Sequence, residues 1–195
     1  MPHRNINISD RTGLCRRLRT SDEESFREHL LRLDTITRRG RFGLAVSEHF
    51  LEAYAARTMA SEAILYGYFE DEVLRGVSEL HPLGTMDIAT AEAAFSVERD
   101  WQGRGIGSTL MERILAAACA RSIRRVIVTC QASNRTMRHL AAGFAADLEI
   151  IGDEVVGHVS TPRPTAFTFA REAIEESYNV ANVMFDVGRL LTARG

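Results

Sequence analysis

The segment Gln102-Gly103-Arg104-Gly105-Ile106-Gly107 decides how the middle of this 195-residue chain folds. An apolar run over residues 93–97 comes before it, and residues 108–115 after it have the composition of a helix. A strand that turns through glycines into a helix presents several backbone N–H groups at one point, and the helix N-terminus adds about half a positive charge there. The segment therefore predicts a strand–turn–helix unit that binds phosphate.

The spacing of the glycines argues against two common phosphate-binding folds. A dinucleotide-binding fold has Gly-x-Gly-x-x-Gly in its first strand–turn–helix unit, whereas here the unit lies mid-chain and Gly103, Gly105 and Gly107 alternate strictly. The eight-residue phosphate loop that ends in Gly-Lys-Ser/Thr is also absent from the sequence.

The segment resembles the Q/R-x-x-G-x-G/A signature of the GNAT superfamily of acyl-CoA-dependent N-acyltransferases, through Gln102, Gly105 and Gly107. Residues 132–141 are similar to the second cofactor segment of that family, and the whole resemblance runs from about residue 91 to residue 144. Glu92, ten residues before Gln102, makes the stretch similar to the acetyltransferase domains of bacterial protein-lysine acetyltransferases.

The resemblance implies an α/β fold of the GNAT type, a mixed and mostly antiparallel central sheet with helices on both faces. In that fold the strands that carry the two cofactor segments splay apart, and the pantetheine arm of acetyl-CoA enters the gap. It implies acetyl-CoA as co-substrate and no metal. The implied cofactor-binding residues are Val97, whose backbone N–H faces the oxyanion, Asn134 on the pantetheine arm, and the pyrophosphate-binding turn of Gln102, Gly103, Arg104, Gly105, Ile106, Gly107 and Ser108.

Glu92 is the predicted general base, because the glutamate at the matching position has that role in the lysine acetyltransferases. An amine needs a base, since a lysine ammonium with a pKa of about 10.4 is not nucleophilic at neutral pH. Ala91, Ala93 and Phe95 are expected to give Glu92 a partly apolar pocket that strengthens it as a base. The alternative is that Glu92 only begins a strand and points into water.

Several residues of the resemblance have structural alternatives. Arg104 either adds charge for the pyrophosphate or faces solvent, and Ser108 is either a phosphate ligand or an early-helix polar residue. Asn134 either contacts pantetheine or caps a helix, which Ser133 would do equally well. The tyrosine that serves many relatives as acid for the leaving thiolate is replaced by Ala141, so the acid is unassigned. His139 is a weak substitute, and Gly143-Phe144 stands two residues earlier than the family's Gly-Phe.

Composition is that of an ordinary globular protein, with 45% hydrophobic and 26% charged residues. A net charge of −2 argues against a general nucleic-acid surface, and no apolar run approaches the length of a membrane span. The three cysteines lack metal-like spacing. Cys119 and Cys130 are interpreted as small buried hydrophobes, with a catalytic thiol at Cys130 as the alternative. The first thirty residues lack a secretory signal, so we expect a cytoplasmic protein.

Hydrophobic periodicity divides the chain into a domain over residues 1–170 and a C-terminal amphipathic helix over 171–195. Strands are predicted over residues 14–19, 63–69, 73–80, 90–98, 125–131, 148–151, 154–159 and 167–169. Helices are predicted over 21–33, 48–59, 133–143 and from residue 108 to about residue 121. Residues 34–43 are predicted to be a basic connection without regular structure. The C-terminal helix carries two apolar stripes, and because one domain surface covers only one stripe, we predict a homodimer.

The acceptor is expected to be a primary amine, of which a protein lysine is one possibility. The first alternative is a small amine such as a polyamine or aminoglycoside, which the basic run from Arg38 to Arg41 would repel if polycationic. The second alternative is a catalytically silent acyl-CoA sensor, which would keep the glycine turn but would not need Glu92.

Overall fold

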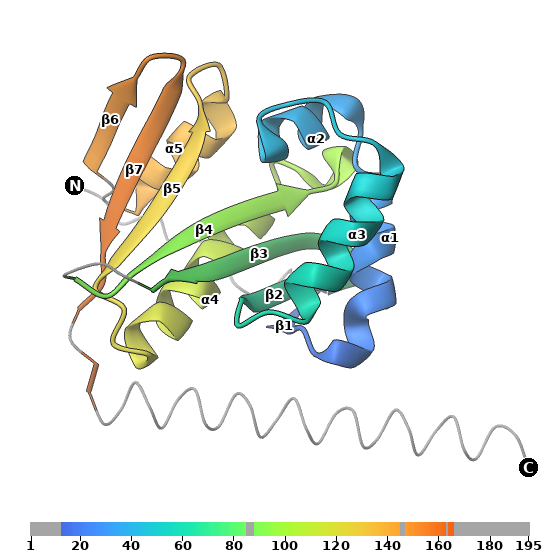
Figure 1. Cartoon of the computed structure of the whole chain (residues 1–195), viewed down its shortest axis with the longest axis horizontal. Coiled ribbons are helices and arrows are strands. Elements are labelled where there is room, and N and C mark those ends of the chain that lie inside the picture. The colour runs from blue at the N-terminus through green and yellow to red at the C-terminus, as the bar shows by residue number, and fades with distance from the viewer. Residues whose placement is uncertain (1–12, 85–87, 145–146, 163, 166–195) are drawn as a thin grey trace, which may run out of the picture.

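One seven-stranded sheet forms the centre of the protein (Figure 1). The structure, a computed structural model, describes residues 13–84, 88–144, 147–162 and 164–165. The strand order is β1-β2-β3-β4-β5-β7-β6, and every neighbouring pair is antiparallel except β4 and β5. The predicted mixed, mostly antiparallel sheet is therefore confirmed. The strands are β1 (Leu14–Arg17), β2 (Ile64–Glu70), β3 (Val73–Leu83), β4 (Thr90–Val97), β5 (Arg125–Gln131), β6 (Asp147–Ile151) and β7 (Glu154–Ser160).

Helices cover both faces of the sheet, as the resemblance implied (Figure 1). Side chains of a strand alternate between faces, so each strand contributes to two cores. Tyr66 and Leu80 pack with α4 on one face, whereas Leu65 and Val77 pack with α1 and α3 on the other. The described helices are α1 (Glu23–Arg32), α2 (Thr35–Phe42), α3 (Glu48–Met59), α4 (Ile106–Ala120) and α5 (Arg135–Gly143), with short 3₁₀ turns η2 (Thr20–Asp22) and η3 (Arg99–Trp101).

The parallel strands β4 and β5 form a fork. They pair only from Thr90 to Ala93 and from Arg125 to Val128. Beyond this point residues 94–97 pair with β3 alone, and residues 129–131 pair with β7 alone. In Figure 1 the two strands diverge toward the ends that carry the glycine turn and α5. This is the splay that the resemblance implied and that periodicity could not reveal.

Residues 34–43 correct one sequence prediction, because residues 35–42 form helix α2 rather than an irregular connection. The Asp34 side chain accepts hydrogen bonds from the amides of Ile36 and Thr37 at the start, and Gly43 ends the helix with a left-handed φ of 76°. Both capping residues are visible in the sequence. The helix was not predicted because Gly40 and the β-branched residues 35–37 have low helix propensity.

Strand β3 is longer than predicted and includes Pro82, which pairs with Ala91. Glu98 N–H donates to the carbonyl of Arg75, so odd-numbered residues of β3 bond to β4 and the missing N–H of Pro82 faces the β2 side. Because β2 begins at Ile64, opposite Leu80, no ladder bond is lost there.

Two predictions lie outside the described residues: the strand over residues 167–169 and the C-terminal helix with its dimer contact. None of the helices in the described part of the chain is long and apolar enough to cross a membrane.

Candidate active site

The glycine turn ends at the N-terminus of α4 with its amide groups unused. Gly103 and Gly105 both have left-handed φ angles, of 74° and 78°, which glycine adopts without strain. The first helical bond runs from the amide of Thr109 to the carbonyl of Gly105. The amides from Gly103 to Ser108 consequently have no acceptor among the described residues. This cluster of N–H groups fits an anion such as pyrophosphate.

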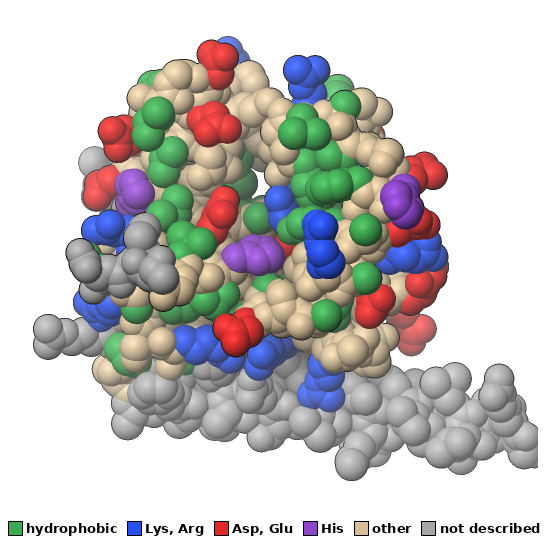
Figure 2. Space-filling view, viewed as in Figure 1, with side chains coloured by type: hydrophobic (Ala, Val, Ile, Leu, Met, Phe, Trp, Pro, Cys, Tyr) green, Lys and Arg blue, Asp and Glu red, His purple; other side chains and the backbone are tan. Residues whose placement is uncertain are grey.

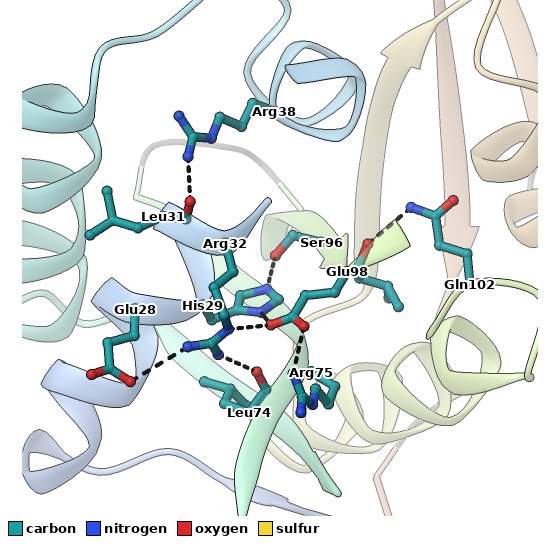
Figure 3. Close-up of polar contacts among 11 residues, drawn as sticks. Glu28, His29, Leu31, Arg32, Arg38, Leu74, Arg75, Ser96, Glu98 and Gln102 are labelled. Carbon is teal, nitrogen blue, oxygen red and sulfur yellow. Dashed lines mark hydrogen bonds and ion pairs between the residues drawn. The ribbon is translucent and has the colours of Figure 1, made fainter. Parts of the chain in front are cut away.

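Gln102 differs from the other residues of the turn. Its amide already donates to the carbonyl of Arg99, at 3.1 Å, which removes it from the predicted set of pyrophosphate donors. Its side-chain amide turns back and donates to the carbonyl of Val97 at 2.9 Å and to the Thr37 hydroxyl at 3.3 Å (Figure 3). The glutamine of the motif therefore fastens the turn to the end of β4 and to α2.

The amide of Val97 faces the fork. Glu98 N–H bonds to β3, and in an antiparallel ladder neighbouring residues point their backbone groups to opposite edges. The N–H of Val97 thus points toward the side on which β4 has parted from β5. The geometry agrees with the oxyanion-facing position predicted for this group.

Arg104 and Gly107 show how the turn is packed. The Arg104 guanidinium lies 4.6 Å from the centre of the Trp101 ring, and Arg75 lies 5.0 Å from the same centre. Gly107 is helical and meets Leu140 of α5, which a Cβ would approach to 3.4 Å. A Cβ at residue 107 would therefore make only an ordinary van der Waals contact, whereas Gly105 needs glycine for its φ angle. Ser108 is half-buried in the first turn of α4.

Asn134 is the N-cap of α5, one of the two roles that the sequence left open. Its side-chain oxygen accepts a hydrogen bond from the amide of Met137 at 3.0 Å. Its side-chain nitrogen lies toward Gly40 of α2, across from the tip of β5. Gln131, at the end of β5, donates to the carbonyl of Gly43. Helix α2 therefore reaches both prongs of the fork, through Thr37 on one side and Gly43 on the other.

Glu92 lies on the sheet face that α1 and α3 cover, not in the apolar pocket expected for it. Ala91 and Ala93 point to the opposite face, into the core formed with α4, and Phe95 packs there too. The Glu92 side chain is exposed. Directly opposite it on β3 stands His81, in a hydrogen-bonded pair of the ladder. The neighbour of Glu92 is thus an imidazole.

Behind His81 lies a buried carboxylate, Glu79, which sequence reasoning missed. Its side chain is fully buried and accepts three hydrogen bonds, from side chains of α2, α3 and β3. The donors are Arg41 at 2.8 Å, the Tyr54 hydroxyl at 2.6 Å and His81 Nε2 at 3.1 Å. Arg41 also donates to the Tyr54 hydroxyl. We call Glu79, Arg41, Tyr54 and His81 the Glu79 cluster.

Electrostatics keep the Glu79 cluster ionised. Burial by itself raises the pKa of Glu79, but the charge of Arg41 and the three donors outweigh it and lower the pKa to about 2. Burial also raises the pKa of Tyr54, aided by the nearby carboxylate, so this hydroxyl keeps its proton. A glutamate within an apolar strand was the only sequence signal for this cluster.

This face of the molecule is hollowed between its two halves, as Figure 2 shows. Hydrophobic side chains gather on both sides of the hollow, over the β6–β7 hairpin and over α2 and α3. The exposed apolar residues of these elements include Ile36, Phe50, Leu148, Ile150 and Ile151. The free amides of the glycine turn lie at the end of the fork. The Glu92–His81 pair lies on the sheet face that α1 and α3 cover, and hydrophobic side chains flank the hollow on this face.

Comparison with known proteins agrees with this geometry. The profile of the acetyltransferase (GNAT) family matches residues 27–144. The chain belongs to the GNAT family. It is accordingly an acyltransferase that uses acetyl-CoA, and the interpretation as a silent acyl-CoA sensor is set aside.

Individual relatives span most of the GNAT domain. Acetyltransferase PA5475 of Pseudomonas aeruginosa is 29% identical over 140 residues, which cover 67% of this chain and 74% of that protein. The GNAT domain of PAT from S. lividans superposes with a TM-score of 0.67 at 19% identity, covering 75% of this chain and 89% of that one. The yncA protein of Salmonella typhimurium, solved with acetyl-CoA, has a TM-score of 0.59 at 15% identity over 80% and 99% of the two chains.

A second buried carboxylate, Glu98, lies between the end of β4 and the 3₁₀ turn η3 that leads into the glycine turn (Figure 3). Arg32 and Arg75 donate to its two oxygens at 2.8 and 2.9 Å, and His29 Nδ1 lies 3.4 Å away. His29 Nε2 lies 2.9 Å from the Ser96 hydroxyl. These five residues, the Glu98 cluster, join α1 and β3 to the point where the chain leaves β4 for the turn. The cluster was not predicted.

Charge effects in the Glu98 cluster fix the state of its histidine. Burial raises the pKa of Glu98, but the hydrogen bonds from His29, Arg32 and Arg75 lower it to about 2. Burial lowers the pKa of His29, which has no exposed surface. The ionised carboxylate only accepts, so Nδ1 of neutral His29 carries the proton and Nε2 accepts from Ser96.

Three further expectations from the sequence concern the basic run from Arg38 to Arg41, the Cys130 thiol and His139. The basic run does not form a cationic surface, because Arg41 is paired with Glu79 and Arg38 donates to the carbonyl of Leu31, which leaves Arg39 exposed. Burial raises the pKa of the Cys130 thiol, which argues against a catalytic thiolate. His139 is exposed on α5. Within the described residues no group of three or more potential ligands is arranged to hold a metal ion.

Proposed function

We propose that this GNAT enzyme transfers the acetyl group of acetyl-CoA directly to a primary amine, with Glu92 as the group that draws the proton from the amine. The observation that carries the proposal is the fork between β4 and β5, which opens after Ala93 and ends beside the free amides of the glycine turn, while Glu92, just before the opening, is exposed on the face that α1 and α3 cover. Cofactor and acceptor then reach the fork from different faces of the sheet, as direct transfer in a ternary complex requires.

In this reaction the ammonium loses one proton to Glu92, directly or through a water, and the neutral amine attacks the thioester carbonyl. The carbon–nitrogen bond forms while the oxyanion is stabilised near the amide of Val97. The carbon–sulfur bond then breaks, and the thiolate takes the second proton of the attacking nitrogen. The products are an amide and the free thiol of CoA, with one proton released.

The side of the fork that binds acetyl-CoA is tested by Gly105→Glu. A side chain at a residue with a φ of 78° strains the backbone, and a carboxylate placed among the amides repels pyrophosphate. We expect calorimetry to find no acetyl-CoA binding to a protein that still unfolds cooperatively. Undiminished affinity would contradict the assignment of the turn.

The role of Glu92 is tested by Glu92→Gln. We expect near-normal acetyl-CoA affinity and a turnover lower by roughly 10²–10⁴-fold, the usual contribution of one general base. A variant that turns over like the wild type would place the base elsewhere.

For the acceptor we favour the ε-amine of a protein lysine. The elements on either side of the hollow carry exposed apolar side chains, among them Ile36 of α2 at 69% and Ile150 of β6 at 69% exposure, and such side chains suit a polypeptide better than a small polar amine. In addition, all 24 basic residues of the sequence are arginine, so the chain offers no ε-amine that would compete with its substrate. Lysine is normally among the commonest residues of soluble proteins.

A lysine introduced into this lysine-free chain is a direct probe of the acceptor. We expect Arg39→Lys, at an exposed position of α2, to gain an acetyl group detectable by mass spectrometry on incubation with acetyl-CoA. The same substitution combined with Glu92→Gln controls for spontaneous acetylation. If labelled acetyl-CoA modifies a panel of small amines but neither this lysine nor the proteins of a lysate, the small-amine alternative replaces the lysine acceptor.

We also propose that the protein is cytoplasmic and forms a homodimer. The dimer is inferred from the two apolar stripes that the sequence pattern places on residues 171–195. Removal of residues 172–195 is expected to give insoluble protein or a changed oligomeric state. Light scattering that finds the intact chain monomeric at high concentration would reject the dimer.

A further inference from the structure

Among the described residues two histidines contact carboxylates, His29 and His81, and of these only His81 has a ring nitrogen without a hydrogen-bond partner in the described part of the chain. Glu79 is ionised and only accepts hydrogen bonds, so the Nε2 atom that lies 3.1 Å from it carries the proton of the neutral ring. The other nitrogen, Nδ1, is then a free lone pair, and no described residue donates to it. The side chain of His81 is 33% exposed, so water reaches part of the imidazole.

The position of His81 brings this lone pair to the proposed reaction site. His81 and Glu92 form a directly opposed pair of β3 and β4, with both side chains on the face of the hollow. The ionisable groups that contact or directly oppose the imidazole are Glu79 on the same strand and Glu92 on β4, with Arg41 of α2 and Tyr54 of α3 bonded to Glu79. His158 of β7 lies in the same cross-strand row, beyond Ile127 of β5. Tyr54 keeps its proton and Arg41 is committed to Glu79, so neither competes for a proton from the substrate.

The apolar surroundings that would have strengthened Glu92 as a base are absent, since Ala91, Ala93 and Phe95 face the other side of the sheet. Imidazole is the side chain whose proton affinity lies nearest to neutral pH, and general bases work best in that range. A carboxylate fixed behind an imidazole holds its tautomer and stabilises the imidazolium that forms, as in catalytic triads.

We propose that His81 is the proton acceptor that works with Glu92 in this active site, oriented and charge-balanced by the buried Glu79. This rests on the proposed amine acetylation. The first ammonium proton, drawn toward Glu92, is taken up by His81 Nδ1, and the imidazolium stands between two carboxylates until it releases the proton to water. The second proton leaves with the thiolate as before, so the step needs no further reactant.

The test compares His81→Gln, His81→Ala and, as matched control, His49→Gln at an exposed position of α3. We expect His81→Gln to lower kcat by about 10²-fold with an unchanged KM for acetyl-CoA, and to change the pH dependence of the rate. In His81→Ala, added imidazole should restore turnover in proportion to its concentration. His49→Gln should behave like the wild type.

Other outcomes overturn the inference in distinguishable ways. Unchanged kcat in His81→Gln, with Glu92→Gln inactive, removes His81 and leaves the proposed function intact. A lower rate without imidazole rescue and without a changed pH profile reduces His81 to a positioning residue. If the wild-type protein acetylates no amine at all, the proposed function fails first and the inference fails with it. Thermal unfolding of each variant separates these results from misfolding.

Discussion

The two buried carboxylates, Glu79 and Glu98, have the same charge chemistry and different surroundings. Each is held by arginine and histidine, and each has its pKa lowered to about 2. In the Glu98 cluster the histidine is fully buried and both of its ring nitrogens have partners. In the Glu79 cluster the histidine is one-third exposed and uses one nitrogen only. The same ion-pair pattern therefore holds the chain before the glycine turn in the Glu98 cluster, whereas in the Glu79 cluster it leaves one nitrogen of His81 free for the proposed proton transfer.

The partners of the carboxylates also differ in their access to water. Arg41 has 11% of its side chain exposed, whereas Arg32 and Arg75 have 34% and 24%. Loss of Glu79 would leave a charge in the protein interior, while loss of Glu98 would leave two charges that solvent can reach. This difference sets the order of the effects expected below.

The largest effect is expected from Glu79→Gln. Breaking a buried pair by removing one partner leaves an uncompensated charge, which costs about 3–5 kcal/mol of unfolding free energy. Chemical denaturation at neutral pH would measure it. Tyr54→Phe is the matched control, because it removes one hydrogen bond from the same carboxylate without a change of charge and should cost about 1 kcal/mol. Equal losses in both variants would show that Arg41 relaxes into water.

Glu98→Gln should have a smaller effect on stability and a distinct effect on cofactor binding. The loss of hydrogen bonds from two partly exposed arginines costs about 1–3 kcal/mol. Because Glu98 directly precedes η3 and the glycine turn, we expect weaker acetyl-CoA binding by calorimetry, whereas Glu79→Gln should leave that affinity unchanged. The opposite assignment of the two effects would contradict the division of roles between the clusters.

The smallest and most specific effect is a pH dependence that only the Glu98 cluster should show above pH 5. His29 has an ordinary pKa of 6.5 when unfolded and a lowered one when folded, so below pH 6.5 the unfolded chain binds a proton that the folded chain does not. Stability should then fall by at most about 1.4 kcal/mol per pH unit. The lowered pKa values of Glu79 and Glu98 act later, as pH falls from 4.5 toward 2.

Unfolding curves between pH 7 and pH 5 test this window. His29→Gln should flatten the curve, because the amide keeps partners for Glu98 and Ser96 and does not titrate. His49→Gln, an exposed position, should leave the slope unchanged. A slope that persists in His29→Gln would assign the titration to another group.

The chemistry of the cofactor turn was readable from the sequence because it depends on local backbone geometry. Glycines at residues 103 and 105 adopt φ angles that other residues avoid, and an adjoining helix start supplies the amides, so a short motif carries the whole signal. Strands and helices with regular periodicity were found for the same reason, and Arg125–Gln131 and Glu48–Met59 have the predicted bounds. Helix α2 was missed because its interior propensity opposed its caps.

Everything that depends on which side chains share a face was decided by the tertiary structure. Alternation along β4 separates Glu92 from the alanines beside it in sequence and places it opposite His81 on another strand. The sequence suggested that Arg41 is a solvated or substrate-facing charge. In the structure helix α2 places Arg41 against Glu79, which is 38 residues away in the sequence. Pairings at such separations are set by sheet register and helix packing, whose free energies are summed over the whole core. The sequence by itself therefore determined the glycine turn that we propose to bind acetyl-CoA, while the fold determined which groups lie beside Glu92, the proposed base.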